Sequence, residues 1–537
     1  MRSAADLAEP SSADAPLTPR QQEILRLLTA GAANKEIAER LGISLGTVKQ
    51  HLASLYKRMN VRNRAMAVSK GMGQADSSPP QIGITRRPCA AMSLCLSPDC
   101  AEADARYLQR CLAGLAFDGK AIFLARDRQG GDLVFGVRHR AENLMAGLLQ
   151  IGLLLQLELQ AQPQILPQLS LSLTVGLALV TRQRFGGEVS DDLVASSVVA
   201  EARQLCAETP PGQLRLSQHA IGVLQAEGLG ASCRGVAQMP LNELTCLFRP
   251  ALADLPPLFG REAEWQQISR QLQQSQAQLL VLEGETGMGK SRLCQQLIQQ
   301  MPADAQLFWL QALPIACAYP LLDLRRQCLL DRQALLQQLD QIDSAQAGLL
   351  IIDDFHLLPS EVRQAILPRF GATGRLHWLL AGRRIELETA DLRLRLPRLD
   401  DAAIARLIQT IRGEPRADLT AESAGIPLFA RELARHGDAE LPLSLLMMIT
   451  ERLDGLRLDW KLLYLLSQGS KAMQIGNLAQ AMGERPEQVQ QAVHLAVKSG
   501  ALSLHGQGEE AWVAFHHPLV RRVVEQLGMD WNAEPNG

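Results

Sequence analysis

The sequence lacks several features that mark special classes of protein. Its ten cysteines include no Cys-x-x-Cys pair and no accompanying histidine cluster, so their spacing predicts neither a zinc site nor a disulfide framework. Residues 1–15 are polar and contain acids, which excludes a secretory signal. The longest uncharged stretch, 159–181, is interrupted by Pro163 and Pro167, and we therefore expect no membrane span. These absences predict a cytoplasmic protein with reduced thiols.

Net charge is also nearly absent. The 54 Lys and Arg residues are balanced by 56 Asp and Glu residues, and this balance predicts no particular partner. The distribution of charge along the chain is more informative, because residues 17–70 contain ten basic and three acidic side chains. The sequence therefore places a small basic module on a mildly acidic body.

The length of 537 residues predicts about three to five domains, and no internal repeat points to a solenoid. Hydrophobic periodicity and Pro- or Gly-rich joints predict a multidomain protein with α and α/β parts. We expect a flexible leader (1–16), a basic helical module (17–70), a linker (71–87), an α/β domain with antiparallel strands (88–250), an α/β domain with a parallel sheet (258–397), a helical segment (398–455) and a last compact unit (456–530).

The basic module has the pattern of a helix-turn-helix. Thr18 and Pro19 form a helix start, a second helix is expected from about Asn34, and Ser44 caps a third helix that runs to about Met59. A helix of this size fits the major groove of DNA, and its exposed face carries amide and cationic side chains suited to bases and phosphates. They are Thr47, Lys49, Gln50, His51, Lys57 and Arg58.

The stretches LTPRQQEILRLL, NKEIAERLGIS, GTVKQHL and LYKRMNVRNRAMAV resemble the LuxR-type helix-turn-helix of bacterial regulators. This resemblance implies binding to double-stranded DNA, with Lys49 and Gln50 facing bases and Thr47, Lys57 and Arg58 facing phosphates. It also implies a dimer contact in the helix that starts near Asn63. The competing interpretation is a basic, solvated helical bundle.

A second motif predicts nucleotide binding. It fits G-x-x-x-x-G-K-[ST] between a predicted strand (Leu279–Glu283) and a helix, and consists of Gly284, Glu285, Thr286, Gly287, Met288, Gly289, Lys290 and Ser291. In such a loop the backbone amides bind phosphate oxygens, the lysine reaches the β- and γ-phosphates, and the hydroxyl joins the shell of Mg²⁺. We therefore expect ATP or ADP with Mg²⁺ at Lys290 and Ser291.

Acidic and basic residues follow two further predicted strands. Asp353 ends the strand GLLIIDD and can hold Mg²⁺ together with Ser291, and Asp354 could orient a water. Arg383 and Arg384 follow the strand LHWLLAG, where a cation could sense the γ-phosphate. The alternatives are solvated acids and a plain surface pair.

Residues 258–527 resemble the STAND branch of AAA-type ATPases, which act as regulatory switches. LFGREAEW resembles the opening motif of that branch, GIPLF its Gly-x-Pro motif near the adenine, and AFHHPLVRRVV the end of its winged helix. The resemblance implies nucleotide contacts by Pro427 and His517 and self-association in the ATP state. For His517, a role in the core or at the surface is an equal alternative.

The segment 86–250 resembles the class III nucleotide cyclase homology domain, through RRPCAAMSLCL, DLVFG and LSLTVGLALV. The two metal-binding aspartates of that family would fall near Cys95 and Gln129, and the transition-state asparagine near Val199, which leaves only Arg203 at a family-like position. A thiol and an amide cannot replace two carboxylates at a two-metal site. We expect no cyclase activity, unless a register shift brings Asp132 into the site.

The sequence thus predicts an ATP-regulated bacterial transcription regulator that is cytoplasmic, associates with the nucleoid when bound, self-associates on DNA, and is at most a slow ATPase. Two rivals stay open. One is a nucleotide cyclase with appended DNA-binding and ATPase modules, and the other is a signalling scaffold that nucleotide merely stabilises.

Overall fold

The computed structural model describes residues 19–29, 37, 41, 45–59, 81–126, 129–137, 144–185, 188–230, 238–250, 252, 257–313, 319–325, 328–329, 335–343, 345–370, 374–436, 441–456, 458–469 and 471–530. The chain divides into two compact units. One contains residues 1–85, 181–192 and 530–537, and the other contains residues 86–180 and 193–529. The predicted leader and the dimer helix expected from Asn63 fall outside the described residues, as does the helix expected from Asn34 apart from Ile37 and Leu41.

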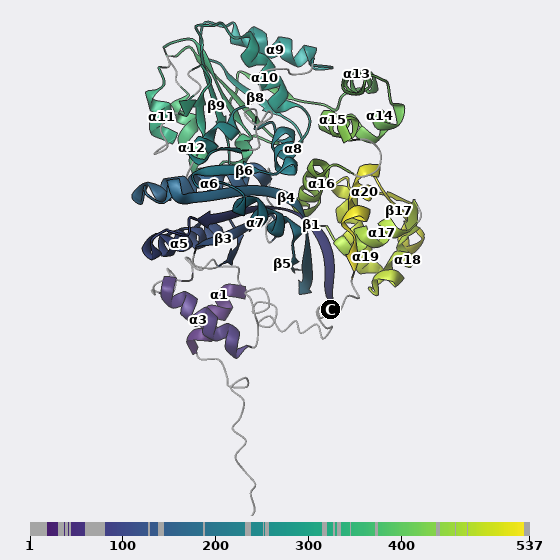
Figure 1. Cartoon of the computed structure of the whole chain (residues 1–537). Helices are drawn as coiled ribbons and strands as arrows, with labels where there is room; N and C mark the ends of the chain where they lie inside the picture. The colour runs from purple at the N-terminus through teal and green to yellow at the C-terminus, as the bar shows by residue number, and fades with distance from the viewer. Residues whose placement is uncertain are drawn as a thin grey trace, which may run out of the picture. The chain divides into compact units, whose positions relative to one another are not determined.

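The first unit contains two helices of the predicted DNA-binding module, α1 (Pro19–Thr29) and α3 (Leu45–Arg58) (Figure 1). Pro19 occupies the first helical position, as predicted, because its missing N–H needs no partner there. Apolar side chains at helical spacing form the core: Ile24, Leu28, Ile37, Val48, Leu52 and Leu55. The Gln21 amide also donates to the Ser54 hydroxyl at 3.0 Å, which fixes α1 against α3.

We use the name central domain for residues 81–250. Its strands are β1 (Gln81–Leu96), β2 (Ile122–Ala125), β3 (Gly130–Phe135), β4 (Leu169–Phe185), β5 (Glu188–Ala195), β6 (Gln213–Leu216) and β7 (Gln238–Pro240). They are ordered β2-β3-β1-β4-β6-β7, with β5 paired to β4. The predicted linker 71–87 is corrected at its end, since residues 81–87 belong to β1.

Four helices belong to the central domain: α5 (Glu102–Asp118), α6 (Leu144–Glu158), α7 (Ser197–Ala207) and α8 (Gln218–Ala226), with 3-10 turns at Leu159–Ala161, Leu166–Gln168 and Leu241–Phe248. The segment Leu144–Ala161 is long and apolar enough to cross a membrane, but 78% of it is buried inside the protein. It packs as a core helix against α5, α8 and the turn at Leu241–Phe248. The uncharged stretch 159–181 forms two turns and most of β4.

The predicted ATPase domain (257–397) contains strands β8 (Leu279–Glu283), β9 (Gln306–Gln311), β10 (Leu321–Asp323), β11 (Cys328–Leu329), β12 (Gly348–Asp353), β13 (Leu376–Gly382) and β14 (Leu392–Arg395). Their order is β11-β10-β9-β12-β13-β8-β14. Neighbours from β9 to β14 are parallel, and β10 and β11 add an antiparallel edge. The near-continuous apolar strands fit a sheet covered on both faces, as the sequence predicts.

Helices cover this sheet: α9 (Glu262–Leu272), α10 (Lys290–Gln300), α11 (Leu335–Gln341) and α12 (Ser360–Ile366), with 3-10 turns at Phe355–Leu357 and Leu367–Arg369. Alternate strand residues such as Val281, Leu350 and Leu380 share one core with α11 and α12. Since successive strand residues point to opposite faces, α10, which contacts β12 and β13, covers the other face.

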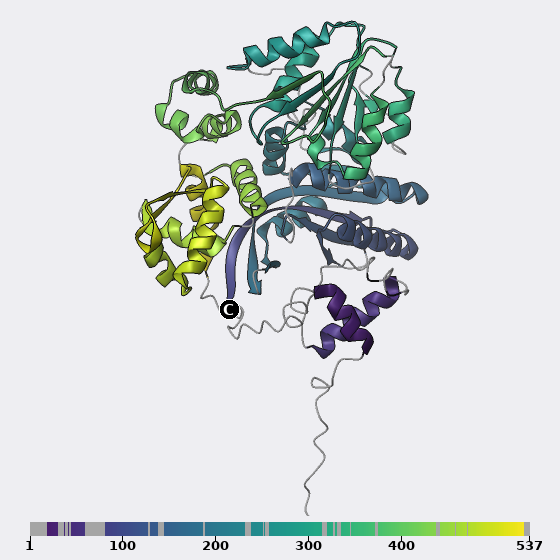
Figure 2. The same ribbon diagram turned by 180° about the vertical axis from the view of Figure 1, so that it is seen from behind.

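The remaining chain is mainly helical. The lid comprises α13 (Asp401–Arg412), α14 (Ala417–Ser423), α15 (Pro427–His436) and α16 (Leu443–Gly455). The C-terminal unit contains α17 (Trp460–Gln468), β15 (Ala472–Gln474), α18 (Ile475–Met482), α19 (Pro486–Lys498), β16 (Leu502–His505), a 3-10 turn (Gly508–Glu510), β17 (Trp512–Phe515) and α20 (Pro518–Leu527) (Figure 2). The last strand, β18 (Met529–Asp530), pairs with β1, so the predicted domain 456–530 ends in the sheet of the central domain.

Candidate nucleotide-binding site

The loop between β8 and α10 has a conformation that only glycine adopts easily. Gly287 and Gly289 have φ angles of +83° and +91°. At Gly287 an added Cβ would lie 3.0 Å from the Cβ of Leu428 on the lid. The amide of Leu428 also donates to the Gly287 carbonyl at 3.2 Å, so α15 begins directly beside the loop.

Lys290 is the first residue of α10, and its side chain is buried. Its ammonium group donates to the carbonyls of Gly284 and Glu285 at 2.9 and 3.0 Å, within the loop itself. Burial lowers the pKa of Lys290, and nearby Asp354 and Asp353 partly oppose that effect. The carbonyls of the loop therefore hold the ammonium group, and bound phosphates would compete with these carbonyls for it.

Asp353 is buried at the end of β12 and accepts a hydrogen bond from the Ser291 hydroxyl. Burial, together with the neighbouring Asp354, raises the pKa of Asp353. A hydroxyl and a carboxylate in contact fit the protein side of a Mg²⁺ shell, which phosphates and water would complete. Mg²⁺ bound there would neutralise phosphate charge, and Ser291 and Asp353 are the residues that would hold it.

Asp354 adopts a left-handed conformation with φ of +54°, unusual for a residue other than glycine. Its carboxylate accepts a hydrogen bond from the Gln311 amide at 3.0 Å, and the residue lines the cavity described below. This location agrees with the water-orienting role predicted for it, which stays a prediction.

Arg383 joins the loop to the lid. Its Nε donates to the Thr286 hydroxyl at 2.9 Å, and its Nη2 donates to the Glu451 carboxylate of α16 at 2.8 Å. The next residue of α16, Arg452, lies 3.2 Å from the Glu285 carboxylate. By contrast, Arg384 is exposed. Sequence reasoning missed Glu451, although an acid inside the apolar helix LSLLMMITERLDG was a visible signal.

These residues line a cavity of about 390 Å³. The loop lines it with Thr286, Gly287, Met288, Gly289, Lys290 and Ser291, and Asp354, His356 and Arg383 also line it. Apolar side chains suited to a flat base come from two domains, namely Leu258, Phe259, Leu399, Leu407, Pro427 and Leu428. Of the predicted nucleotide contacts, the cavity brings together Thr286 to Ser291, Arg383 and Pro427, whereas Gly284 and Glu285 are not among the described residues that line it.

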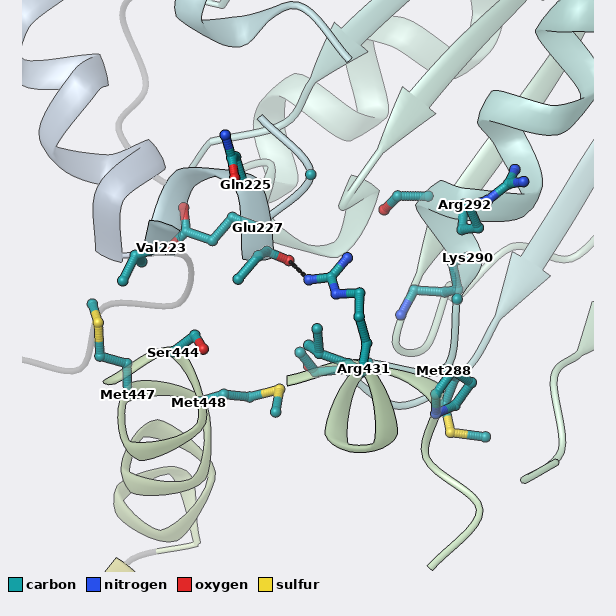
Figure 3. Close-up of a pocket in the computed structure, with 18 of the residues that line it drawn as sticks. Val223, Gln225, Glu227, Met288, Lys290, Arg292, Arg431, Ser444, Met447 and Met448 are labelled. Carbon is teal, nitrogen blue, oxygen red and sulfur yellow. Dashed lines mark hydrogen bonds between the residues drawn. The ribbon is translucent and has the colours of Figure 1, made fainter. Parts of the chain in front are cut away.

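The central domain also lines this cavity, and no local sequence pattern predicts that contribution. Figure 3 shows the end of α8, with Val223, Gln225 and Glu227, opposite Met447 and Met448 of α16. The Glu227 carboxylate accepts the amides of Met145 and Ala146, at the start of α6, at 3.2 and 3.0 Å. Burial raises the pKa of Glu227 to about 8.

His517 lies at the start of α20. It caps α20 by accepting the Leu519 amide at 3.1 Å, and its ring stands edge-on to Phe429, with centroids 5.7 Å apart. It lies outside the set of described residues that line the cavity. Local capping and packing engage its Nδ1 atom and its ring, and the predicted contact with ADP stays a prediction.

The positions predicted for a cyclase metal site hold no carboxylates. Cys95 lies opposite Gly130 in the β1–β3 ladder, next to Gln129, whose side-chain amide donates to the Pro98 carbonyl. Asp132 lies opposite Ser93, is fully buried, and accepts the Ser93 hydroxyl and Arg203 Nε, each at 2.7 Å. Among the described residues, no group of three or more His, Cys, Asp or Glu side chains is placed to hold a metal ion.

The predicted DNA-contacting residues lie on α3. Gln50 is exposed, and Thr47 and His51 are partly exposed, on the side away from the buried Val48 and Leu52. Lys49, Lys57 and Arg58 belong to the same helix.

Two family comparisons match separate parts of the chain. Residues 15–70 match the family described as bacterial regulatory proteins, luxR family. Residues 257–350 match the AAA ATPase domain. The chain carries a LuxR-type DNA-binding module and an AAA-type ATPase module. The LuxR-type match contains every predicted DNA contact, and the AAA-type match contains the whole loop from Gly284 to Ser291.

Individual relatives match the DNA-binding module alone. The putative HTH-type transcriptional regulator YhjB of Escherichia coli is 59% identical over 51 residues, which is 10% of this chain and 26% of that protein. The HTH-type transcriptional regulator MalT of Vibrio campbellii is 38% identical over 53 residues, which is 10% of this chain and 6% of that protein. The chain therefore spans about a quarter or less of the length of these two relatives.

Solved structures are similar to other parts. The adenylyl cyclase CyaB from P. aeruginosa is 12% identical, with 26% of this chain and 82% of that chain covered and a TM-score of 0.21. A STAND protein with a tetratricopeptide repeat sensor from Pyrococcus horikoshii is 15% identical, with 51% of this chain and 43% of that chain covered and a TM-score of 0.25.

Proposed function

We propose that this protein is a DNA-binding transcription regulator and that ATP or ADP at the Gly284–Ser291 loop controls its assembly on DNA. The proposal is supported by one observation: the same chain contains a LuxR-type module and an AAA-type module whose phosphate-binding loop lines a cavity. Lys290 and Ser291 line the cavity, and the buried Asp353 bonded to Ser291 lies beside it, so this cluster offers the groups that bind phosphates and Mg²⁺.

Arg383 is the group through which the nucleotide state would change the lid. In the structure its Nη2 is engaged by Glu451 of α16. A γ-phosphate would compete with Glu451 for this guanidinium, because both are anionic acceptors. ATP can shift the lid only by binding one of its arrangements more tightly than the other, and the exchange at Arg383 supplies such a difference.

The proposal also assigns roles to the central domain and to the C-terminal unit. We take the central domain as cyclase-like and inactive, and the C-terminal unit as a winged helix. The lack of carboxylates at Cys95 and Gln129 supports the first assignment, and the order of helices and antiparallel strands after Trp460 supports the second. Location in the bacterial cytoplasm and nucleoid belongs to the same proposal.

The test uses full-length protein and DNA with two binding sites, in the presence of ATP and Mg²⁺. Lys290→Ala should weaken binding to the paired sites and leave binding to a single site unchanged, because paired sites gain affinity only when two DNA modules are linked. Lys498→Ala, which removes an exposed lysine of α19, serves as the matched control. Equal paired-site affinity of wild type and Lys290→Ala would favour the scaffold interpretation instead.

A further inference from the structure

The nucleotide cavity is shared between the ATPase domain and the central domain. Its lining on the central-domain side comprises Arg87 and Pro88 of β1, Gly136, Leu144, and the stretch from Gln225 to Gly230 at the end of α8. These residues belong to the same compact unit as the loop, so the wall and the loop form one body. A nucleotide held by Lys290 would therefore have the central domain as one side of its binding site.

The first polar contact across this wall is made by Arg431. Its Nη2 donates to the carbonyl of Ala226 at 3.2 Å, over a separation of 205 residues, while its Nε donates to Glu432 at 2.9 Å (Figure 3). Arg431 lies one helical turn beyond Leu428, which contacts the loop at Gly287. Helix α15 thus touches the phosphate-binding loop and the central domain within one turn.

The second contact is an ion pair between Arg87 of β1 and Asp454 of α16, with both side chains less than a tenth exposed. Arg87 Nε also donates to the Gly136 carbonyl at 3.1 Å, and the Trp460 indole donates to the other oxygen of Asp454 at 2.9 Å. Each member of the pair is therefore held on its own side, in the central domain and in the lid respectively. Breaking such a buried pair leaves a charge without its partner, which is costly.

Two acidic residues on one face of α16 contact the two domains. Glu451 and Asp454, three residues apart, line the cavity and contact Arg383 of the ATPase domain and Arg87 of the central domain respectively. A shift of α16 that releases one of these pairs strains the other. The Arg383–Glu451 contact and the Arg87–Asp454 contact are therefore coupled through α16.

We propose that the central domain is a functional part of the nucleotide site and acts as a gate on nucleotide release, with the Arg87–Asp454 pair as its latch. This proposal rests on nucleotide binding at the Gly284–Ser291 loop. A ligand held between the loop, the lid and the central domain loses contacts when one of them moves away, so the dissociation rate should rise as the wall opens. The central domain then sets how long ADP or ATP is retained.

The test measures the release of the fluorescent analogue N-methylanthraniloyl-ADP from the full chain after a chase with unlabelled ADP. Asp454→Asn and Arg87→Ala should each speed release by about tenfold or more, because either change removes the charge pair that closes the wall. Asp340→Ala, which breaks the exposed Arg369–Asp340 pair of the ATPase domain, should leave the rate unchanged. Release rates within twofold of wild type for both latch variants would overturn the gate.

A second measurement covers the case in which the latch variants do not fold. Hydrogen exchange on the wild-type chain should show added protection at residues 218–230 when ADP binds. Unchanged exchange in that stretch would overturn the proposal without any variant. The variant Lys290→Ala distinguishes failure of the proposed nucleotide binding from failure of the gate. If wild type binds the analogue no better than Lys290→Ala, nucleotide binding itself is refuted. If wild type binds the analogue but the latch variants release it at the wild-type rate, only the gate is refuted.

Discussion

Arg203 Nε lies 2.7 Å from the Oδ2 atom of Asp132, a carboxylate with no exposed surface. Arg126 approaches the other oxygen of Asp132 at 3.8 Å. The one family-like residue of the predicted cyclase site is thus engaged with the nearest acid of the sheet. In this domain the pair acts as a structural ion pair between α7 and β3.

The two halves of this pair should contribute unequally to stability. Arg203→Ala leaves a buried carboxylate without its main partner and should lower the free energy of unfolding by about 3 kcal/mol. Asp132→Asn leaves a guanidinium whose side chain is 44% exposed and can hydrate, so we expect a loss of only about 1 kcal/mol. Urea unfolding of the two variants measures the difference, and equal losses would contradict this assignment.

The same geometry predicts that the protein forms no cyclic nucleotide. Two-metal activation of a ribose hydroxyl needs carboxylate ligands, and Asp132 is already neutralised by arginine. Incubation with ATP or GTP and Mn²⁺, analysed by chromatography, should yield no cyclic product above a blank. Product that disappears in Asp132→Ala would instead restore the nucleotide cyclase as the leading function.

Much of the cavity was predictable because its motifs are local. The strand at Leu279–Glu283, the glycines at Gly287 and Gly289 and the start of α10 at Lys290 follow from short-range chemistry. Asp353 was likewise placed by the apolar strand that precedes it.

Contacts between residues far apart in the sequence could not be predicted from local motifs. Arg87 and Asp454 are 367 residues apart, and nothing in the stretch GITRR indicates that a distant sheet partner extends β1 to Gln81. The contact between Arg431 and Ala226 is of the same kind. For His517, the motif match could not indicate the helix cap and the ring contact with Phe429, which depend on the fold around it.

The Arg383–Glu451 contact predicts how the cavity distinguishes ATP from ADP. Glu451→Gln replaces a charged acceptor by a neutral one, which loosens its hold on Arg383. ATP affinity should then rise about fivefold, with little change for ADP, because only ATP presents a γ-phosphate to the freed guanidinium. Calorimetric titration of both nucleotides tests this, and a parallel shift for ATP and ADP would remove Arg383 from the sensing role. Arg384→Ala, at the exposed neighbouring arginine, is the control.

Gln50 should read one base pair. It is exposed on α3, and a glutamine amide can form two hydrogen bonds with adenine in the major groove. Gln50→Ala should relax base preference at one position by about 1–3 kcal/mol while leaving the salt dependence of binding unchanged, since no phosphate contact is lost. Selection from a random DNA library, followed by titration at several salt concentrations, measures both quantities. Unaltered preference at every position would exclude Gln50 from base contact.

His517 predicts an acid-sensitive C-terminal unit. Burial lowers the pKa of His517 to about 4, and the nearby charges of Arg398, Arg452 and His516 act in the same direction. In the unfolded chain the imidazole binds a proton near pH 6.5, whereas in the folded chain it does so only near pH 4. Between these values the unfolded state binds more protons, so stability falls as the pH falls, by about 3 kcal/mol in total.

The variant His517→Asn separates this titration from the capping role of the residue. An asparagine side chain can still accept the Leu519 amide at the start of α20, but it does not titrate. The loss of stability between pH 6.5 and 4 should therefore be smaller in this variant than in wild type. Hydrogen-exchange protection factors for Pro518–Leu527 provide the readout. His516→Asn, at the exposed neighbouring histidine, should retain most of the wild-type pH dependence, and a similar slope in His517→Asn would show that the acid sensitivity arises elsewhere.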